Sequence, residues 1–111
     1  MSYNPKSHFV AIDASGAGDN ILVKKRAGNI IRVLNYVLIA SGAVEATWKS
    51  GESGDASAIS GPMALEAPVS AASAHGLVQT KPGEALNLSL DAGTAVGGHL
   101  VYIEFPETAD I

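Results

Sequence analysis

The chain of 111 residues contains no cysteine. A disulfide framework and a cysteine-based metal site are therefore excluded, and this composition fits a reducing compartment. The length is that of one domain, which buries roughly two thirds of the surface that the unfolded chain exposes. A hydrophobic core can therefore form without covalent cross-links. We expect a single domain over residues 8–105, between tails at residues 1–7 and 106–111.

Charged residues are scarce, at 16%, whereas apolar residues make up 47% of the chain. The net charge of -4 argues against nucleic acid as a partner, because proteins that bind nucleic acid usually carry a dominant basic patch. A small domain with so few charges either exposes apolar surface or buries it against a partner. The composition therefore predicts self-assembly.

No segment is long and apolar enough to span a membrane as a helix. The longest apolar run, "NIIRVLNYVLIASGAV" at Asn29–Val44, is shorter than the about 20 residues that a spanning helix needs. Arg32 and Asn35 would also lie in the hydrocarbon. The N-terminal "MSYNPKSHF" lacks the apolar segment of a secretory signal. We expect no membrane partner and no secretory signal.

The usual catalytic and metal-binding motifs are missing as well. His8, His75 and His99 have no second ligand at metal-binding spacing. No serine lies in a G-x-S-x-G elbow, and "SGESGD" is interpreted as a hairpin loop. "SGAGDN" matches neither the dinucleotide fingerprint nor the P-loop. We therefore expect no enzymatic activity, no catalytic residues, no cofactor and no bound metal.

Two short polar motifs have ordinary structural interpretations. "KKR" at residues 24–26 is the only basic cluster, and we interpret it as a solvated hairpin tip. "NLS" at Asn87 matches the glycosylation sequon but lies inside an expected strand, so we interpret the match as chance.

What the sequence does contain is a series of short apolar runs between glycine-rich turns. Leu86, Leu88 and Leu90 alternate with polar residues, and Val44, Ala46 and Trp48 do the same. Such runs predict an all-β antiparallel sandwich, jelly-roll-like, with about eight strands. The expected strands cover residues 8–13, 19–26, 29–40, 43–49, 57–66, 75–80, 84–91 and 98–105.

The Asn29–Val44 run is apolar on both faces of the expected strand. Its odd positions can face the core, whereas Ile30 and the next four even positions form a second, largely apolar row. We therefore predict a self-assembly interface at Arg32, Leu34, Tyr36 and Leu38. The alternative cover for this row is the Glu52–His75 segment of the same chain. A helix is the less favoured alternative, because β-branched residues and turn signals bracket the run.

Four segments, taken in order, resemble a family of small all-β modules of tailed bacteriophages. They are "SGAGDNILV", "AGNIIRVLNYVLIASGAVEATWKSG", "ISGPMALEA" and "GEALNLSLDAGTAVGGHLVYIEF", and they span about Gly16 to Phe105. The resemblance implies a virion protein without catalytic residues. A module that stands alone resembles the capsid decoration (cement) proteins, which bind between subunits of the major capsid protein, often as homotrimers.

The resemblance thus implies a structural protein of the capsid surface, made in the host cytoplasm. A trimer is the favoured homo-oligomer, with the major capsid protein as partner. The alternative is a structural or host-glycan-binding module of a phage tail fibre or spike. That alternative requires an exposed shelf of aromatic side chains, for which Tyr36 and Trp48 are the candidates, although core packing is favoured for Trp48.

Overall fold

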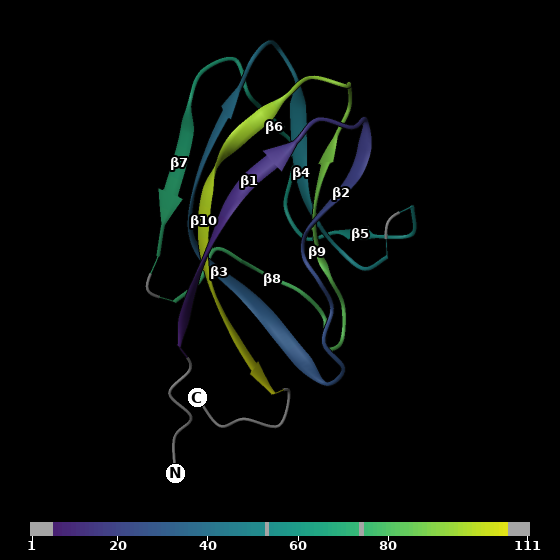
Figure 1. Cartoon of the computed structure of the whole chain (residues 1–111), viewed down its shortest axis with the longest axis vertical. Helices are drawn as coiled ribbons and strands as arrows, with labels where there is room; N and C mark the ends of the chain where they lie inside the picture. The colour runs from purple at the N-terminus through teal and green to yellow at the C-terminus, as the bar shows by residue number, and fades with distance from the viewer. Residues whose placement is uncertain (1–5, 53, 74, 107–111) are drawn as a thin grey trace.

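The computed structural model describes residues 6–52, 54–73 and 75–106, which form a sandwich of two antiparallel sheets (Figure 1). The first sheet contains β1 (Ser7–Ala14), β3 (Asn29–Ala40), β7 (Val69–Ala72), β8 (Val78–Gln79) and β10 (Val96–Pro106). The second sheet contains β2 (Gly18–Val23), β4 (Glu45–Ser50), β5 (Ser57–Ala58), β6 (Met63–Ala64) and β9 (Leu86–Leu90). The predicted all-β sandwich is confirmed.

The strand pairing is that of one long hairpin rolled up into two layers. The first strand β1 pairs with the last strand β10, and β2 pairs with β9. The third strand β3 pairs with β7 and β8, and β4 pairs with β5 and β6. Rolling then adds the β10–β3 and β4–β9 contacts, which complete both sheets. This order is that of an eight-stranded jelly roll. The short strands β5 and β6 together take the place of one strand, and β7 and β8 together take the place of another.

The core lies between the two sheets and follows from the alternation along each strand. Leu86, Leu88 and Leu90 of β9 and Ala46 and Trp48 of β4 all point inward and are buried. The alternation of these residues and the core position of Trp48 were predicted. The first sheet contributes side chains from its three long strands. They include Ile12, Ala14, Ile31, Val33, Leu38, Val96 and Leu100.

The strand prediction is most accurate for the longest strand and least accurate in the middle of the chain. β3 has the predicted bounds, 29–40. The single strand predicted over 57–66 is two strands of two residues each, separated by residues 59–62. β7 was not predicted, because its small residues "VSAA" give a weak hydrophobic signal. Ser7 and Pro106 belong to strands, while residues 1–5 and 107–111 of the predicted tails lie outside the described part.

A β-bulge at Leu34 reverses the alternation of β3. Asn35 pairs with Val101, but the next residue of β10, Tyr102, pairs with Val33, so Leu34 has no counterpart on β10. An extra residue in one strand shifts every later side chain to the opposite face. On the other side of β3, Leu34 lies where β7 ends and β8 has not begun: its carbonyl accepts from Ser73 N at 2.8 Å.

The bulge corrects the predicted faces of β3. Val33 points inward as expected, but beyond Leu34 the inward positions are Tyr36 and Leu38. Leu38 is 0% exposed, so the prediction that a monomer would leave it in water is wrong. The Tyr36 ring lies 5.2 Å from the Trp48 ring, between centroids, and the Tyr36 hydroxyl donates to Met63 Sδ at 3.5 Å.

The cover of these two side chains therefore comes from the same chain. Met63 belongs to the Glu52–His75 segment that was the alternative partner, and Leu65 of that segment is part of the core. The outward positions of the upper half of β3 are instead Val37 and Ile39.

At Gly98, the neighbouring strand leaves no room for a side chain. Its φ angle is +130°, and a Cβ atom added there would lie 1.9 Å from the carbonyl oxygen of Val37 on β3. A side chain at this position would push β10 away from β3, the pair of strands at the centre of the sheet. Glycine is therefore required here by both backbone conformation and space.

The reversed alternation predicts opposite results for aspartate at neighbouring positions. Leu38→Asp places a carboxylate in the core without a partner and should lower the free energy of unfolding by at least about 3 kcal/mol. Ile39→Asp places the same group on the surface of the monomer and should change it by less than about 1 kcal/mol when both proteins are kept too dilute to associate. Urea denaturation followed by tryptophan fluorescence measures both. Equal losses in the two variants would show that the bulge is placed incorrectly.

Gly98→Ala should destabilise the protein by more than about 2 kcal/mol, because the added methyl group meets the Val37 carbonyl and the φ angle is unfavourable for alanine. The matched control is Gly61→Ala, where nothing lies within 4 Å of the added atom and φ is not positive. The same urea titration applies. A Gly98→Ala midpoint as high as that of the control would contradict the close approach.

Candidate assembly surface

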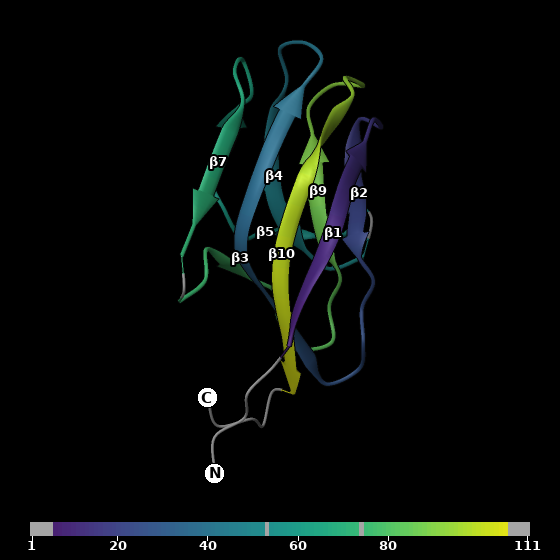
Figure 2. The ribbon, with the colours of Figure 1, turned by 60° about the vertical axis from the view of Figure 1, so that its left-hand side comes forward.

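The outer face of the first sheet, meaning the side that points away from the second sheet, is not covered by any described element. Figure 2 looks onto this face: β7, β3, β10 and β1 lie side by side in front, and the second sheet lies behind them. A sheet with one solvated face should carry polar residues there. This face is instead largely apolar, so we take it as the candidate site and call it the open face.

The open face carries two of the three large hydrophobic side chains that are exposed in the described residues. Phe9 on β1 is 81% exposed and Ile39 on β3 is 50% exposed. Between them lie Val37 on β3 and His99 on β10, which are direct neighbours across the two strands. The outward positions at the centre of the open face include no carboxylate, lysine or arginine. These positions are Gly97, His99 and Val101 of β10 and their partners Ile39, Val37 and Asn35 of β3.

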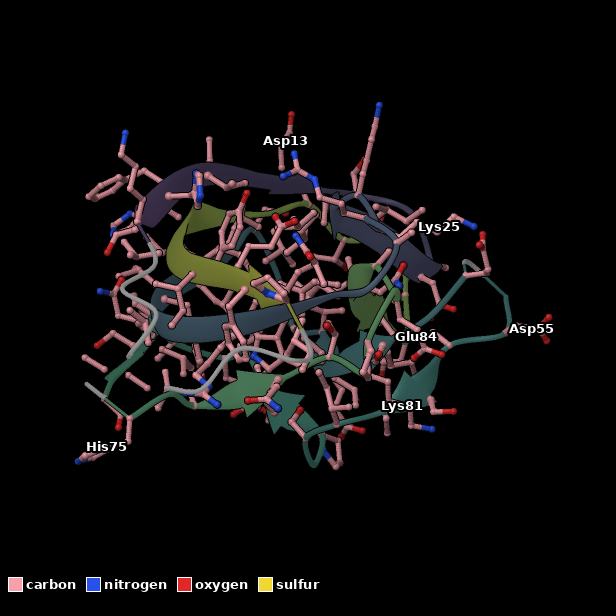
Figure 3. The ribbon with its side chains drawn as sticks, turned by 90° about the horizontal axis from the view of Figure 1, so that it is seen from below. Asp13, Lys25, Asp55, His75, Lys81 and Glu84 are labelled. Carbon is pink, nitrogen blue, oxygen red and sulfur yellow. The ribbon has the colours of Figure 1, made fainter. Side chains whose placement is uncertain are left out.

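A shallow hollow lies at the end of the open face where β10 begins. Its volume is about 390 Å³, and Gly97 forms its floor between Asp13 of β1 and Ile39 of β3. The missing side chain of Gly97 creates the depression, and Ala95 and Ser41 close the far end. Asp13 stands at the rim and its side chain projects away from the body of the molecule (Figure 3).

The structure separates the four residues of the predicted interface. Arg32 lies on the outer side near the opposite end from the hollow, with its guanidinium carbon 4.9 Å from the centre of the Phe105 ring. Its Nε donates to Gln79 Oε1 at 2.8 Å. Leu34 occupies the bulge and is half-buried. Leu38 is fully buried in the core, and Tyr36 is partly buried and packs against the core.

Three side chains of the open face were missed by the sequence analysis. Val37 and Ile39 were assigned to the core by a strict period of two, which the bulge interrupts. Phe9 points to the face opposite Val10 and Ile12, but a single aromatic near the N-terminus gave no signal for an interface. Only the pairing of β1 with β10 brings it beside Val101 and onto the same surface.

The outer face of the second sheet differs, because a loop covers part of it. The loop between β4 and β5 lies over β2 and β9: Gly54 N donates to Asp19 Oδ2 at 2.9 Å, and Asn87 Nδ2 donates to the Gly51 carbonyl at 2.7 Å. "SGESGD" is thus the hairpin loop that was expected. Asn87 is fully buried, so a glycosylating enzyme cannot reach this sequon in the folded protein.

The titratable groups are dispersed over the described part of the chain. His8 stacks on Tyr102 at 5.0 Å between ring centroids, whereas His75 lies in the loop before β8 and points away from the body of the molecule (Figure 3). Burial, with a smaller contribution from the charge of Glu104, raises the pKa of Tyr102. Among the described residues no group of three or more His, Cys, Asp or Glu side chains could hold a metal ion.

The basic cluster is exposed, as predicted, but it does not lie at a hairpin tip: it lies in the connection between β2 and β3, which belong to different sheets. Two of its charges are paired. Lys25 forms an ion pair with Glu52, and this contact raises the pKa of the lysine. Arg26 Nε lies 3.3 Å from Glu104 Oε1, and Asn29 Nδ2 donates to the same oxygen at 3.0 Å. These contacts leave little free positive charge in this cluster for an anionic partner.

Aromatic side chains do not form an exposed shelf in the described part of the chain. Trp48 is 1% exposed, which confirms its predicted place in the core. Tyr36 packs against Trp48, and Tyr102 stacks with His8. Phe9 projects alone from the open face, without a second ring beside it. The residues are thus placed for apolar contact rather than for stacking on sugar rings.

The described residues contain no helix with the length and hydrophobicity needed to cross a membrane. No protein-family model matches the chain, and no curated protein has a significantly similar sequence. Among solved structures, the chain is similar in fold to a subunit of the appendages of Bacillus endospores, a family of disulfide-linked pili. That likeness has a TM-score of 0.53 and 16% sequence identity, and it covers 91% of this chain and 87% of the pilus subunit.

Proposed function

We propose that this chain is a structural subunit of a bacteriophage virion, a decoration (cement) protein that binds between capsid subunits. Its activity would be assembly, with copies of itself and with the major capsid protein, and not catalysis. The observation that carries the assembly part is the open face, on which Phe9, Val37 and Ile39 expose apolar surface that the described chain does not cover. The virion part rests on the sequence resemblance.

The physical argument for assembly is the free energy of burying that surface. Removal of apolar area from water contributes about 25 cal/mol per Å², and monomeric proteins rarely expose large contiguous apolar patches. Few charges on the open face oppose such burial. Repeated over the many equivalent positions of a shell, even modest contacts add up to strong attachment.

The pilus subunit supports the proposal only as an example of what the fold can do. That protein assembles into disulfide-linked pili. This chain has no cysteine, so disulfides cannot link its copies. An assembly of this chain would depend on noncovalent packing, which makes the apolar character of the open face more important.

Self-association should appear as a mass above that of the 11.3 kDa chain in sedimentation equilibrium at micromolar concentration. Ile39→Asp should shift the protein toward monomer, with a dissociation constant at least about tenfold higher, because burial of a carboxylate opposes association. The control is Ile21→Asp, at an exposed position on the outer side of the second sheet. A native chain that stays monomeric throughout the concentration range would contradict self-assembly.

Attachment to the capsid is tested separately, with shells assembled from the major capsid protein alone. We predict that the native protein co-sediments with these shells at a fixed stoichiometry and raises the temperature at which they open. Binding that does not saturate, or no binding at all, would contradict the decoration role and would favour another structural position in the virion.

A further inference from the structure

The open face carries both a projection and a depression of matching character. Phe9 is the most exposed large hydrophobic side chain in the described residues and stands out from β1. The hollow at Gly97 lies on the same face and has an apolar wall formed by Ile39. At about 390 Å³ it has room for a phenyl ring. A knob and a hole on one surface suit contact between two identical surfaces.

The strand register places His99 midway, along the strands, between Phe9 and the hollow at Gly97. Phe9 lies beside Val101, and Asp13 at the rim of the hollow lies beside Gly97. His99 is two residues from each of these positions on β10, and it lies in register with Ala11 of β1 and Val37 of β3. The row through Ala11, His99 and Val37 therefore lies midway between the knob and the hollow.

We infer that two copies of the chain pack open face to open face, related by a two-fold axis that lies parallel to the sheets and passes close to His99. The axis is inclined to the row of His99, because Phe9 lies on β1 and the hollow is centred one strand away, on β10. Rotation by 180° about this axis exchanges the knob and the hollow, so Phe9 of each copy enters the Gly97 hollow of the other. His99 lies near the axis and faces its own counterpart. The inference rests on the proposed self-assembly and specifies its contact. Because this contact closes on itself, it produces a dimer and not the trimer that the resemblance implies.

Gly97 supports this assignment because folding does not require a glycine there. A Cβ atom added to Gly97 would meet only the Ile12 carbonyl oxygen, at an ordinary 3.7 Å, and its φ is not in the positive region. The next residue, Gly98, is required by its contact with Val37. The contacts within the monomer thus account for Gly98 but not for Gly97, whereas the insertion of Phe9 accounts for the empty floor of the hollow.

The size and charge of the open face also suit a second copy. β1, β10, β3 and β7 have 8, 11, 12 and 4 residues. At about 3.3 Å by about 4.8 Å per residue they offer about 550 Å² before side-chain relief is added. A stable interface buries about 800 Å² on each partner. The chain carries a net charge of -4, yet the central rows of the open face have no charged side chain other than Asp13, at the rim, so like charges are not brought together.

Cysteine cross-linking tests the axis directly, because the chain has no cysteine of its own. His99→Cys should place the two thiols opposite each other in the dimer. Stacked sheets lie about 10 Å apart, which exceeds the reach of an unstrained disulfide, so a short bis-maleimide is the appropriate reagent. We expect most of the protein to become a covalent dimer at low micromolar concentration. The matched control is Ile21→Cys, exposed on the second sheet, which should remain largely monomeric.

Two further changes in the His99→Cys background test the knob and the hollow separately. Phe9→Ala removes both knobs of the dimer and should raise the dissociation constant by at least about 100-fold. Gly97→Val fills the hollow without a backbone clash and should weaken the dimer to a similar extent while the monomer stays folded. Circular dichroism and urea denaturation establish the folding of each variant, so a loss of cross-linking is attributable to the contact.

The outcomes distinguish this contact from the proposed function. Selective cross-linking of the His99→Cys protein that is lost in both further variants supports the face-to-face dimer. Equal cross-linking of His99→Cys and Ile21→Cys, or cross-linking that survives both changes, overturns it. A native protein that sediments as a trimer without selective cross-linking overturns the two-fold contact but leaves self-assembly standing, whereas a strict monomer contradicts both.

Discussion

The extra residue in β3 determines which side chains of this strand are buried in the core and which are exposed. Because Leu34 has no counterpart on β10, the first part of β3 buries its odd positions and the second part buries its even positions. Tyr36 and Leu38 thereby point toward the core, where Tyr36 contacts Trp48 and Met63. Val37 and Ile39 are turned outward by the same step. An apolar face that a regular strand would have directed into the core therefore becomes the surface of the first sheet.

Much of the fold follows from the sequence, because short alternating runs between glycine-rich turns leave few architectures other than a two-sheet sandwich. The bounds of β3 and the faces of β4 and β9 were predictable for the same reason. The bulge was not, since a period of two contains no information on where an extra residue is inserted. The predicted interface contains the same error. Arg32 and Leu34 lie before or at the bulge and remain accessible, while the predicted Tyr36 and Leu38 lie beyond it and point toward the core. β5 to β8 are too short and too poor in large side chains to produce a pattern.

The two outer faces of the sandwich differ in how far the chain itself covers them. On the second sheet, hydrogen bonds join the backbone of the loop between β4 and β5 to the side chains of Asp19 and Asn87, and the loop covers polar side chains. On the first sheet no described segment covers the apolar row. A low content of charge, an uncovered apolar face and the absence of cysteine are the observations from which we propose a subunit whose partner supplies the missing cover by noncovalent packing. The proposed virion role adds the capsid as the setting in which that packing is repeated.

The central claim is that the open face, and not the outer face of the second sheet, is buried when the protein assembles. Cross-saturation NMR measures this directly, with a deuterated, methyl-labelled chain mixed with an unlabelled, fully protonated one. The account predicts strong attenuation of the methyl signals of Val37 and Ile39, with the signal of Ile21 unchanged. Attenuation of Ile21 with Val37 and Ile39 unaffected would contradict it.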